Sequence, residues 1–290
     1  MTDKFISNHT LCLGCNAGII VNEILEAIDK PMILVLATGC LEVSTTTYPN
    51  SSYNLPVIHA NFGNSAVVAS GIANAKKMAA IPKETQIVVL AGDGATYDIG
   101  FGALSAMVER GEDVLYICYN NQAYMNTGIQ KSGATPKGAL TKNYLDLSNQ
   151  DKIFPKSIID ILVAQKIPYA AQTIPLFQND LKQKVKTAIN LNGPRYIEVL
   201  SPCIRGWYYE AKNSMNIINL AVETNFWSLL EYKNQKLKIN YKPKKQTPIY
   251  DWLKLQKRFS ALLENKDLID SIQKEIDINW KNLIKKERSN

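Results

Sequence analysis

Short runs of consecutive apolar residues alternate along the first two thirds of the chain with segments whose small and apolar residues recur at helical spacing. Unbroken apolar runs of this length are typical of strands that are buried on both faces of a sheet. Four such runs predict strands at residues 31–40, 85–94, 113–121 and 194–203. Helical spacing predicts helices at residues 64–79, 98–111, 157–166 and 180–193.

The alternation of strands and helices indicates parallel βαβ units, so the predicted fold class is α/β with a doubly wound, mainly parallel sheet. Ligands of such sheets bind outside the carboxyl ends of the strands. Each predicted strand runs into small, polar or sulfur-containing residues: Gly39–Cys40, Gly92–Asp93–Gly94, Asn120–Asn121 and Pro202–Cys203. We therefore expect the candidate chemistry at one edge of one sheet.

The pattern changes near residue 205, where aromatic-rich and then lysine-rich segments replace the alternation of strands and helices. We expect an α/β domain over residues 1–204 and a C-terminal extension over residues 205–290, which ends in a helical stretch at 268–286. A length of 290 residues suits one large or two small domains.

Charge is concentrated in this extension, because lysines are few before residue 130 and many from Lys233 onward, within a net charge of +7. The basic tail predicts either a solvated surface or a docking site for an acidic partner. It lacks an arginine-rich cluster or a known motif, so we expect no nucleic-acid partner. The chain has no run of 18 apolar residues and its first ten residues do not resemble a secretory signal. We expect a cytoplasmic protein without a membrane span.

A glycine-flanked aspartate follows the second predicted strand, in the sequence Gly92-Asp93-Gly94-Ala95. Glycines let the backbone approach a phosphate, and a helix N-terminus offers free N–H groups. Asp93 would repel that phosphate unless a divalent cation lay between them, and Mg²⁺ commonly binds one or two carboxylates together with ligand phosphates. Asn121, at the end of the next predicted strand, is the expected second oxygen donor. Gly-Asp-Gly alone is equally typical of a tight turn, whereas its pairing with Asn121 is more specific.

The succession of strand, Gly-Asp-Gly, helix, strand and Asn-Asn resembles the diphosphate-binding motif of thiamine diphosphate enzymes. Longer stretches resemble the thiamine-binding subunit of pyruvate:ferredoxin oxidoreductases, in the 2-oxoacid:ferredoxin oxidoreductase family. The segment YMNTGIQKSGATP is highly specific, and the resemblance covers most of the chain. The stretches are residues 37–49, 58–72, 92–136 and 250–263.

The resemblance implies the thiamine diphosphate-binding fold and an Mg²⁺ site on Asp93, the Asn121 side chain and the Ala123 backbone carbonyl. It also implies that Asn126 contacts the substrate or an intermediate, although a loop asparagine that bonds its own backbone would show the same pattern. His59 would equally suit a hydrogen-bonded core histidine. The implied cofactor-binding residues are Gly39, Cys40, His59, Gly92, Asp93, Gly94, Ala95, Asn121, Ala123, Thr127 and Gly128.

An odd number of cysteines, five, argues against a disulfide framework and for metal or catalytic use. From spacing alone, four of them could hold Zn²⁺ or an iron–sulfur cluster. A thioredoxin-like dithiol is less favoured, because no strand precedes Cys12. The resemblance implies a [4Fe–4S] cluster on Cys12, Cys15, Cys40 and Cys203. Cys118 lies inside an apolar strand, where a free cysteine behaves as a small hydrophobic residue.

One residue departs from the family pattern, since members commonly have glycine directly after the second cysteine and this chain has Asn16. Asparagine tolerates a left-handed backbone better than most residues, so we expect Asn16 to keep such a turn. Its side chain is expected to reach a cluster sulfur or the thiamine.

The reaction implied by the resemblance is the reversible, coenzyme A-dependent oxidative decarboxylation of pyruvate to acetyl-CoA and CO₂, with electrons passing through the cluster to ferredoxin or flavodoxin. The chain has no room for the second α/β domain whose glutamate activates the aminopyrimidine ring. The resemblance therefore implies an alpha subunit with that glutamate, and gamma and delta subunits of which one is ferredoxin-like.

Three other functions stay open. One is a sister enzyme that acts on 2-oxoglutarate, a branched-chain 2-oxo acid or oxalate. Another is a non-oxidative thiamine diphosphate decarboxylase, against which the four cysteines argue. The third is a non-catalytic, zinc-stabilised binding module with a basic tail.

Overall fold

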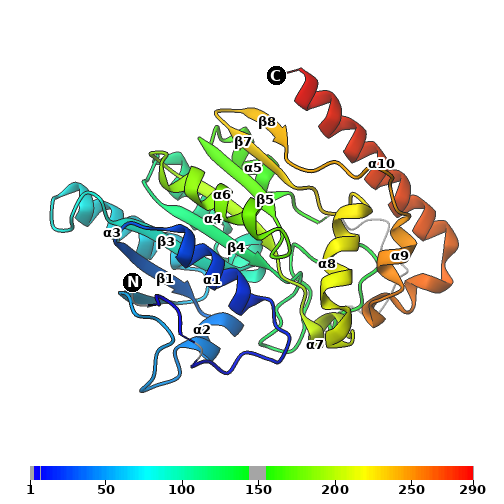
Figure 1. Ribbon diagram of the computed structural model, residues 1–290, viewed down its shortest axis with the longest axis horizontal. Helices are drawn as coiled ribbons and strands as arrows, with labels where there is room; N and C mark the ends of the chain where they lie inside the picture. The colour runs from blue at the N-terminus through cyan, green and yellow to red at the C-terminus, as the bar shows by residue number, and fades with distance from the viewer. Residues whose placement is uncertain (1–2, 7, 144–154, 290) are drawn as a thin grey trace.

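One eight-stranded sheet runs through the computed structural model, which describes residues 3–6, 8–143 and 155–289 (Figure 1). The strand order is β2-β1-β3-β4-β6-β5-β7-β8. The first six strands are parallel, and β7 is antiparallel to both of its neighbours, β5 and β8. The four predicted strands are its centre, and with them the mainly parallel α/β fold is confirmed. They are β1 (Met32–Ala37), β3 (Gln86–Gly92), β4 (Leu115–Asn120) and β6 (Arg195–Leu200).

Four further strands have no counterpart among the apolar runs. β2 (Val57–Ala60) forms one edge of the sheet and exposes two of its four residues, so it never appears as a buried run. β5 (Tyr169–Thr173) is short and follows Pro168. The last two, β7 (Leu230–Lys233) and β8 (Lys236–Ile239), alternate buried and exposed residues.

Helices cover both faces of the sheet. α1 (Ala17–Ala27) and α6 (Gln178–Ile189) pack on one face, against the side chains of Leu34, Leu90 and Ile117. The opposite face is covered by α3 (Ser65–Lys77), α4 (Phe101–Glu109) and α5 (Ile158–Ala164). The predicted helices are therefore present, and the helix expected from residue 98 begins earlier. A π-helical turn, η1 (Gly94–Ile99), starts directly after Asp93 and leads into α4.

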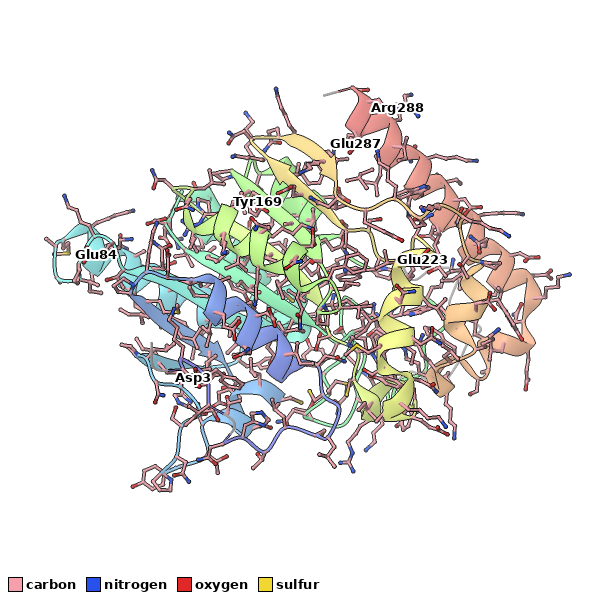
Figure 2. All side chains as sticks on the ribbon, viewed as in Figure 1. Asp3, Glu84, Tyr169, Glu223, Glu287 and Arg288 are labelled. Atoms are coloured by element: carbon pink, nitrogen blue, oxygen red, sulfur yellow. The ribbon has the colours of Figure 1, made fainter. Side chains whose placement is uncertain are left out.

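The C-terminal extension contributes strands to the same sheet. β7 pairs antiparallel with β5, and the hydroxyl of Tyr169, which Figure 2 labels, donates to Glu231 Oε2 at 2.9 Å across this pair. Asn234 and Gln235 join β7 to β8 with φ values of 49° and 69°, as two-residue hairpin turns require. The lysines on the exposed face of this hairpin interrupt its apolar residues, so the sequence shows no buried apolar run there. The domain boundary at residue 204 stays a prediction.

The rest of the extension builds a third apolar core beside the carboxyl ends of β5 and β6, around Trp207, Trp252 and Phe259. The helix predicted at 268–286 is present as α10. Its end, where Figure 2 labels Glu287, is bonded to the sheet because Glu287 Oε1 accepts a hydrogen bond from Ile239 N at 2.7 Å. The helices are α7 (Ile204–Trp207), α8 (Ser214–Glu223), α9 (Ile249–Leu253) and α10 (Lys266–Arg288), with short turns η3 (Ala211–Asn213), η4 (Lys257–Phe259) and η5 (Leu262–Glu264).

Over the described residues, no helix has both the length and the apolar character that crossing a membrane requires.

Candidate active site

The predicted site residues meet where the strand order reverses. The chain leaves β1 for the edge strand β2 and returns on the other side as β3, which makes the β1/β3 junction the switch point at which ligands of such sheets bind. A small cavity of about 40 Å³ lies there. It is far below the 300–1,000 Å³ or so typical of enclosed ligand pockets, so a cofactor would extend beyond it. Its walls include Gly39, Cys40, Gly92, Asp93, Gly94, Asn121, Ala123, Asn126 and Thr127.

Asp93 is a buried carboxylate that forms no ion pair with any described residue, and its residue is 1% exposed. Ser132 Oγ donates to its Oδ2 at 2.5 Å, and Asn121 N donates to its Oδ1 at 3.2 Å. Burial nevertheless raises the pKa of Asp93 to about 7. A carboxylate in this position needs either a proton or a cation to offset the cost of desolvation.

Asp93 Oδ1, the Ala123 carbonyl oxygen and one end of the Asn121 side-chain amide meet at one point. With its nitrogen turned inward, the Asn121 amide donates to Ala123 O at 2.7 Å and to Asp93 Oδ1 at 3.0 Å; with its oxygen turned inward, it adds a third oxygen to this group. From the described residues, this oxygen accepts only a long bond of 3.4 Å from Ala123 N. Oxygens packed in this way repel one another unless a cation lies between them, and oxygen is the ligand that Mg²⁺ prefers. These donors therefore fit a magnesium ion.

Several residues that the sequence did not single out hold this arrangement. Trp207 Nε1 donates to Asn121 O at 2.7 Å, and Arg258 donates to Gln122 Oε1 at 2.7 Å. Gln122 itself has a φ of 65° and is buried. The only sequence signal for Ser132 and Arg258 is that both lie in stretches that resemble the family.

Gly94 is explained by a tyrosine. A Cβ at this position would lie 2.5 Å from Cε1 of the Tyr124 ring, so only glycine lets that ring pack on the first turn after Asp93. Tyr124 Oη in turn donates to Asp98 Oδ2 at 3.0 Å. The structure thus gives Gly94 a packing role, and the binding of phosphate by this turn stays a prediction.

Four cysteines from three distant segments come together near the small cavity. Cys12 and Cys15 lie in the loop before α1, Cys40 opens α2 (Cys40–Thr45), and Cys203 precedes α7. All four are free thiols that interact electrostatically with one another. Burial raises the pKa of Cys15 to about 11 and that of Cys40 to about 12, so a positive partner is needed to ionise them.

The cysteine spacing does not suit a single ion. A zinc ion about 2.3 Å from each sulfur would hold the sulfurs about 4 Å apart. Within the described part of the chain, no three Cys, His, Asp or Glu side chains are close enough to share one metal ion. A cluster of several irons bridged by sulfide separates its thiolates further, so it fits these four thiols better than zinc does. Cys118 is fully buried in β4, which confirms the expectation that it is a core residue.

The oxygen set and the cysteine set belong to one site. The Cys40 thiol donates to Oδ1 of Asn126, which lies in the loop that follows Asn121, at 3.9 Å. A Cβ on Gly206 would lie 2.1 Å from Sδ of Met125, so this loop also packs directly on the helix that follows Cys203. The predicted magnesium-binding oxygens and the predicted cluster-binding cysteines therefore both lie next to the loop at residues 121–128.

Residues 37–199 match the model of a thiamine pyrophosphate enzyme, C-terminal TPP binding domain. The chain belongs to this family. It is 42% identical to the pyruvate synthase subunit PorB of Methanocaldococcus jannaschii over 284 residues, which span 95% of this chain and 94% of that subunit. It is 38% identical to the PorB subunit of Thermotoga maritima, over 95% of this chain and 90% of that subunit.

Another relative carries a different substrate in its name. The chain is 40% identical to the ketoisovalerate oxidoreductase subunit VorB of Pyrococcus abyssi, over 98% of this chain and 93% of that subunit. A solved structure, the 2-oxoglutarate:ferredoxin oxidoreductase from Magnetococcus marinus, has the same fold with a TM-score of 0.58 and 18% identity. That likeness covers 74% of this chain and 79% of the other and concerns the fold alone.

This thiamine pyrophosphate enzyme chain departs from the sequence prediction at Asn16. Asn16 has φ −76° and ψ −13°, which is right-handed, and the left-handed turn falls on Gly14 with φ 77°. The expected left-handed turn at Asn16 is therefore wrong. Its buried amide donates to Pro202 O and to Ser214 Oγ, both at 3.2 Å, instead of reaching a sulfur. Asn16 thus joins the first cysteine loop to the segment that carries Cys203.

Three predicted cofactor contacts lie outside the walls of the small cavity. His59 is on the edge strand β2 with 51% of its side chain exposed, and its Nδ1 lies 2.7 Å from Glu42 Oε1. The alternative of a core histidine is therefore wrong. Ala95 is buried in the turn after Asp93, and Gly128 has a φ of 120° beside Lys142. A cofactor contact for these three residues stays a prediction.

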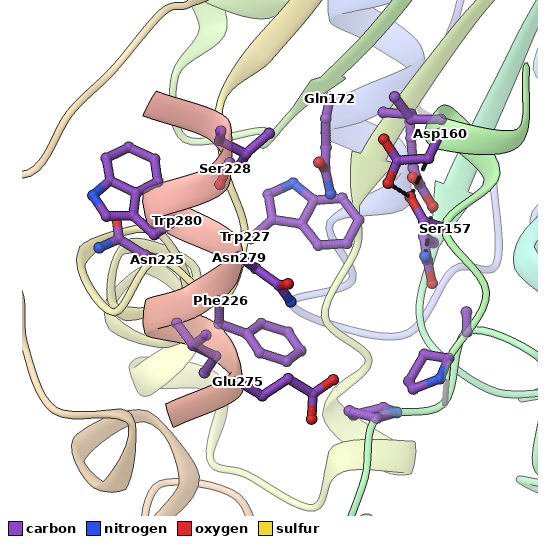
Figure 3. A pocket seen from close by; sticks show the side chains of 18 of the residues that line it. Ser157, Asp160, Gln172, Asn225, Phe226, Trp227, Ser228, Glu275, Asn279 and Trp280 are labelled. Atoms are coloured by element: carbon purple, nitrogen blue, oxygen red, sulfur yellow. Dashed lines mark hydrogen bonds between the residues drawn. The ribbon is translucent and has the colours of Figure 1, made fainter. Parts of the chain in front are cut away.

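A larger cavity of about 660 Å³ lies behind the site, between α5, the loop before β7 and α10. Figure 3 shows the Trp227 and Phe226 side chains extending into this region from the loop, with Ser157 and Asp160 on another side. Its wall includes Glu198, which accepts hydrogen bonds from the Tyr97 hydroxyl and from Asn120 Nδ2. Burial raises the pKa of Glu198 to about 7, and nothing in the sequence pointed to this residue.

Proposed function

We propose that this chain is the thiamine diphosphate-binding subunit of a 2-oxoacid:ferredoxin oxidoreductase that oxidises pyruvate and coenzyme A to acetyl-CoA and CO₂, and reduces ferredoxin or flavodoxin. One observation carries the proposal: the oxygens of Asp93, Asn121 and Ala123 converge beside four thiols at the switch point of the sheet. An enzyme that only released an aldehyde would not need the thiols.

In this proposal Asp93, Asn121 and the Ala123 carbonyl hold Mg²⁺, which binds the diphosphate of the cofactor. Cys12, Cys15, Cys40 and Cys203 hold a [4Fe–4S] cluster. When bound, thiamine diphosphate supplies a carbon nucleophile for the keto group of a 2-oxo acid, and the cluster accepts electrons singly. Ser132 keeps the Asp93 carboxylate in place, and Trp207 fixes the backbone of Asn121.

Asn126 is proposed to orient the substrate, because it lies on the exposed side of the small cavity and its amide oxygen faces Cys40. This places a polar side chain between the oxygen set and the thiols. The remaining residues proposed to contact the cofactor are Gly39, Cys40, His59, Gly92, Gly94, Ala95, Thr127 and Gly128.

Other chains complete the proposed enzyme. The small cavity is open and holds no glutamate among its walls, so an alpha subunit is proposed to supply the glutamate that activates the aminopyrimidine ring. Gamma and delta subunits, one of them ferredoxin-like, are proposed to carry the electrons onward. The PorB and VorB names, each that of one subunit, support an assembly of this kind. A cytoplasmic location stays a prediction.

Pyruvate is the proposed substrate because pyruvate synthase subunits are 42% and 38% identical to this chain over almost its whole length. The 40% identity to a ketoisovalerate oxidoreductase subunit keeps a branched-chain 2-oxo acid as the second candidate. Coenzyme A as the co-substrate is supported by the fold relative, whose structure contains coenzyme A. The ratio kcat/KM for pyruvate, 2-oxoisovalerate, 2-oxoglutarate and oxalate distinguishes these substrates.

The test is anaerobic purification of the chain co-produced with its partner subunits, followed by an absorption spectrum and assays of iron, sulfide, magnesium and thiamine. Asp93→Ala should abolish Mg²⁺-dependent thiamine diphosphate binding and leave the iron content unchanged. Cys40→Ala should weaken the iron–sulfur absorption and electron transfer. Cys118→Ala is the matched control for Cys40→Ala and should keep both.

Full cofactor affinity in Asp93→Ala would show that the metal site is wrong. A colourless wild-type complex that still decarboxylates pyruvate would favour a non-oxidative decarboxylase, and zinc without retained thiamine would favour a binding module. Turnover by this chain without its partners would refute the proposed division of the active site.

A further inference from the structure

A buried arginine from the C-terminal extension lies beside the cysteines. Arg258, in η4, is 3% exposed. No carboxylate of the described residues forms an ion pair with it. A guanidinium remains protonated in proteins, and a buried charge is costly unless an opposite charge offsets it. This arginine therefore lacks the negative partner that its position requires.

Neutral groups accept two of its hydrogen bonds and cover its faces. The Arg258 guanidinium donates to Gln122 Oε1 at 2.7 Å and, through Nε, to Gln256 Oε1 at 3.0 Å. Its centre stacks 3.7 Å above the Trp207 ring and lies 4.8 Å from the Phe259 ring. These contacts fix the guanidinium in one orientation, but they do not neutralise its charge.

Two acidic groups of the site act on Arg258: Cys203 of the cysteine set and, more weakly, the unpaired carboxylate of Asp93, whose charge Mg²⁺ offsets in the proposed function. Trp207, which Arg258 stacks upon, belongs to α7, and Cys203 is the residue that caps α7. Burial lowers the pKa of Arg258, and Cys203 is the group that opposes this shift most strongly. Four thiolates around an iron–sulfur core leave an excess of negative charge, which is the partner that the arginine lacks.

We propose that Arg258 is a positioning residue that offsets the negative charge of the loaded cysteine site and raises the reduction potential of its cluster. The proposal rests on the proposed function, because it requires a cluster on the four cysteines. Reduction adds an electron to a site that is already negative, so a fixed cation nearby stabilises the reduced form more than the oxidised form. Water does not screen this attraction because the guanidinium is buried.

The experiment measures the reduction potential of this cluster by EPR-monitored titration of the assembled complex. The signal of interest is the part of the spectrum that the Cys40→Ala complex lacks. Arg258→Gln removes the charge, and Gln122→Glu neutralises it by placing an isosteric carboxylate against the guanidinium. Arg258→Lys keeps the charge and loses the planar fork. Arg205→Gln, at an exposed position two residues after Cys203, is the matched control.

Arg258→Gln and Gln122→Glu should shift the potential to more negative values than the wild type, whereas Arg205→Gln should not move it. Arg258→Lys should lie closer to the wild type than Arg258→Gln does. Gln122→Glu tests the effect of the Arg258 charge on the potential even if the Arg258→Gln protein does not fold, because it adds an ion pair without removing the arginine.

A wild-type potential in both Arg258→Gln and Gln122→Glu would overturn the proposal. Equal shifts in Arg258→Lys and Arg258→Gln would also overturn it, because retention of the charge would then have no effect. A wild-type complex that shows no signal sensitive to Cys40→Ala would refute the proposed cluster itself, which is a different result from a cluster with an unchanged potential.

Discussion

Replacement of Glu198 by glutamine should change how the stability of this chain depends on pH. Glu198 is 2% exposed and accepts hydrogen bonds from Tyr97 and Asn120 at Oε1, which a glutamine oxygen can also accept. The substitution therefore keeps the shape and both bonds. It removes the ability to ionise and replaces Oε2 by an amide nitrogen, whose effect on stability does not depend on pH.

The size of the effect follows from the pKa. Burial raises the pKa of Glu198 from 4.5 to about 7 in the folded chain. Below pH 4.5 the carboxyl is protonated in both states, and above about pH 7 it is ionised in both. Between these values the unfolded chain releases its proton first, so the free energy of unfolding falls as pH rises. At about 1.4 kcal/mol per pKa unit, the full loss is about 3 kcal/mol.

The assay is urea unfolding of the full chain, wild type and Glu198→Gln, at several pH values from about 4.5 to 8, with the free energy extrapolated to water. The stability of Glu198→Gln relative to the wild type should rise by up to about 3 kcal/mol across this range. Contributions from other groups, including Asp93, cancel in the difference. Glu84→Gln makes the same chemical change at an exposed position and should stay within about 0.5 kcal/mol of the wild type.

A difference between Glu198→Gln and the wild type that does not depend on pH would show that Glu198 is not desolvated as the structure indicates. A difference that shrinks as pH rises would reverse the sign and point to a cation near the carboxylate.

Three further outcomes test the packing of the site. Gly94→Ala should destabilise the chain by about 1–3 kcal/mol in urea unfolding, and most of that cost should disappear in the Tyr124→Ala background; additive effects would exclude the steric explanation. Trp207→Phe should remove the bond to Asn121 and weaken Mg²⁺-dependent thiamine diphosphate binding in a fluorescence titration, and unchanged affinity would contradict the role given to it. Asn16→Gly should lower the free energy of unfolding by about 1–2 kcal/mol, because it removes a buried amide that joins two segments; equal stability would show that this amide contributes nothing.

The centre of the sheet was predictable because β1, β3, β4 and β6 are buried on both faces, and burial on both faces requires unbroken apolar runs. The edge strand β2 and the hairpin of β7 and β8 were not, since each exposes part of its surface and its polar residues interrupt the pattern. The helix after Asp93 was predicted too late for a different reason. Its first turn is π-helical, and helical spacing in a sequence does not show such a turn.

The sequence by itself determined which side chains follow the central strands, and parallel strands must bring their carboxyl ends to one edge. That is why Asp93 and Asn121 were predictable as a pair. The tertiary structure alone decided what surrounds them, because Ser132, Trp207 and Arg258 reach the site from segments 11 or more residues away from Asn121 in the chain. Spacing along a chain does not show such distant contacts. It also does not show the burial that leaves Asp93, Glu198 and Arg258 without an ion pair among the described residues. Those properties depend on how the whole chain packs, and they are what turns a set of motifs into a site.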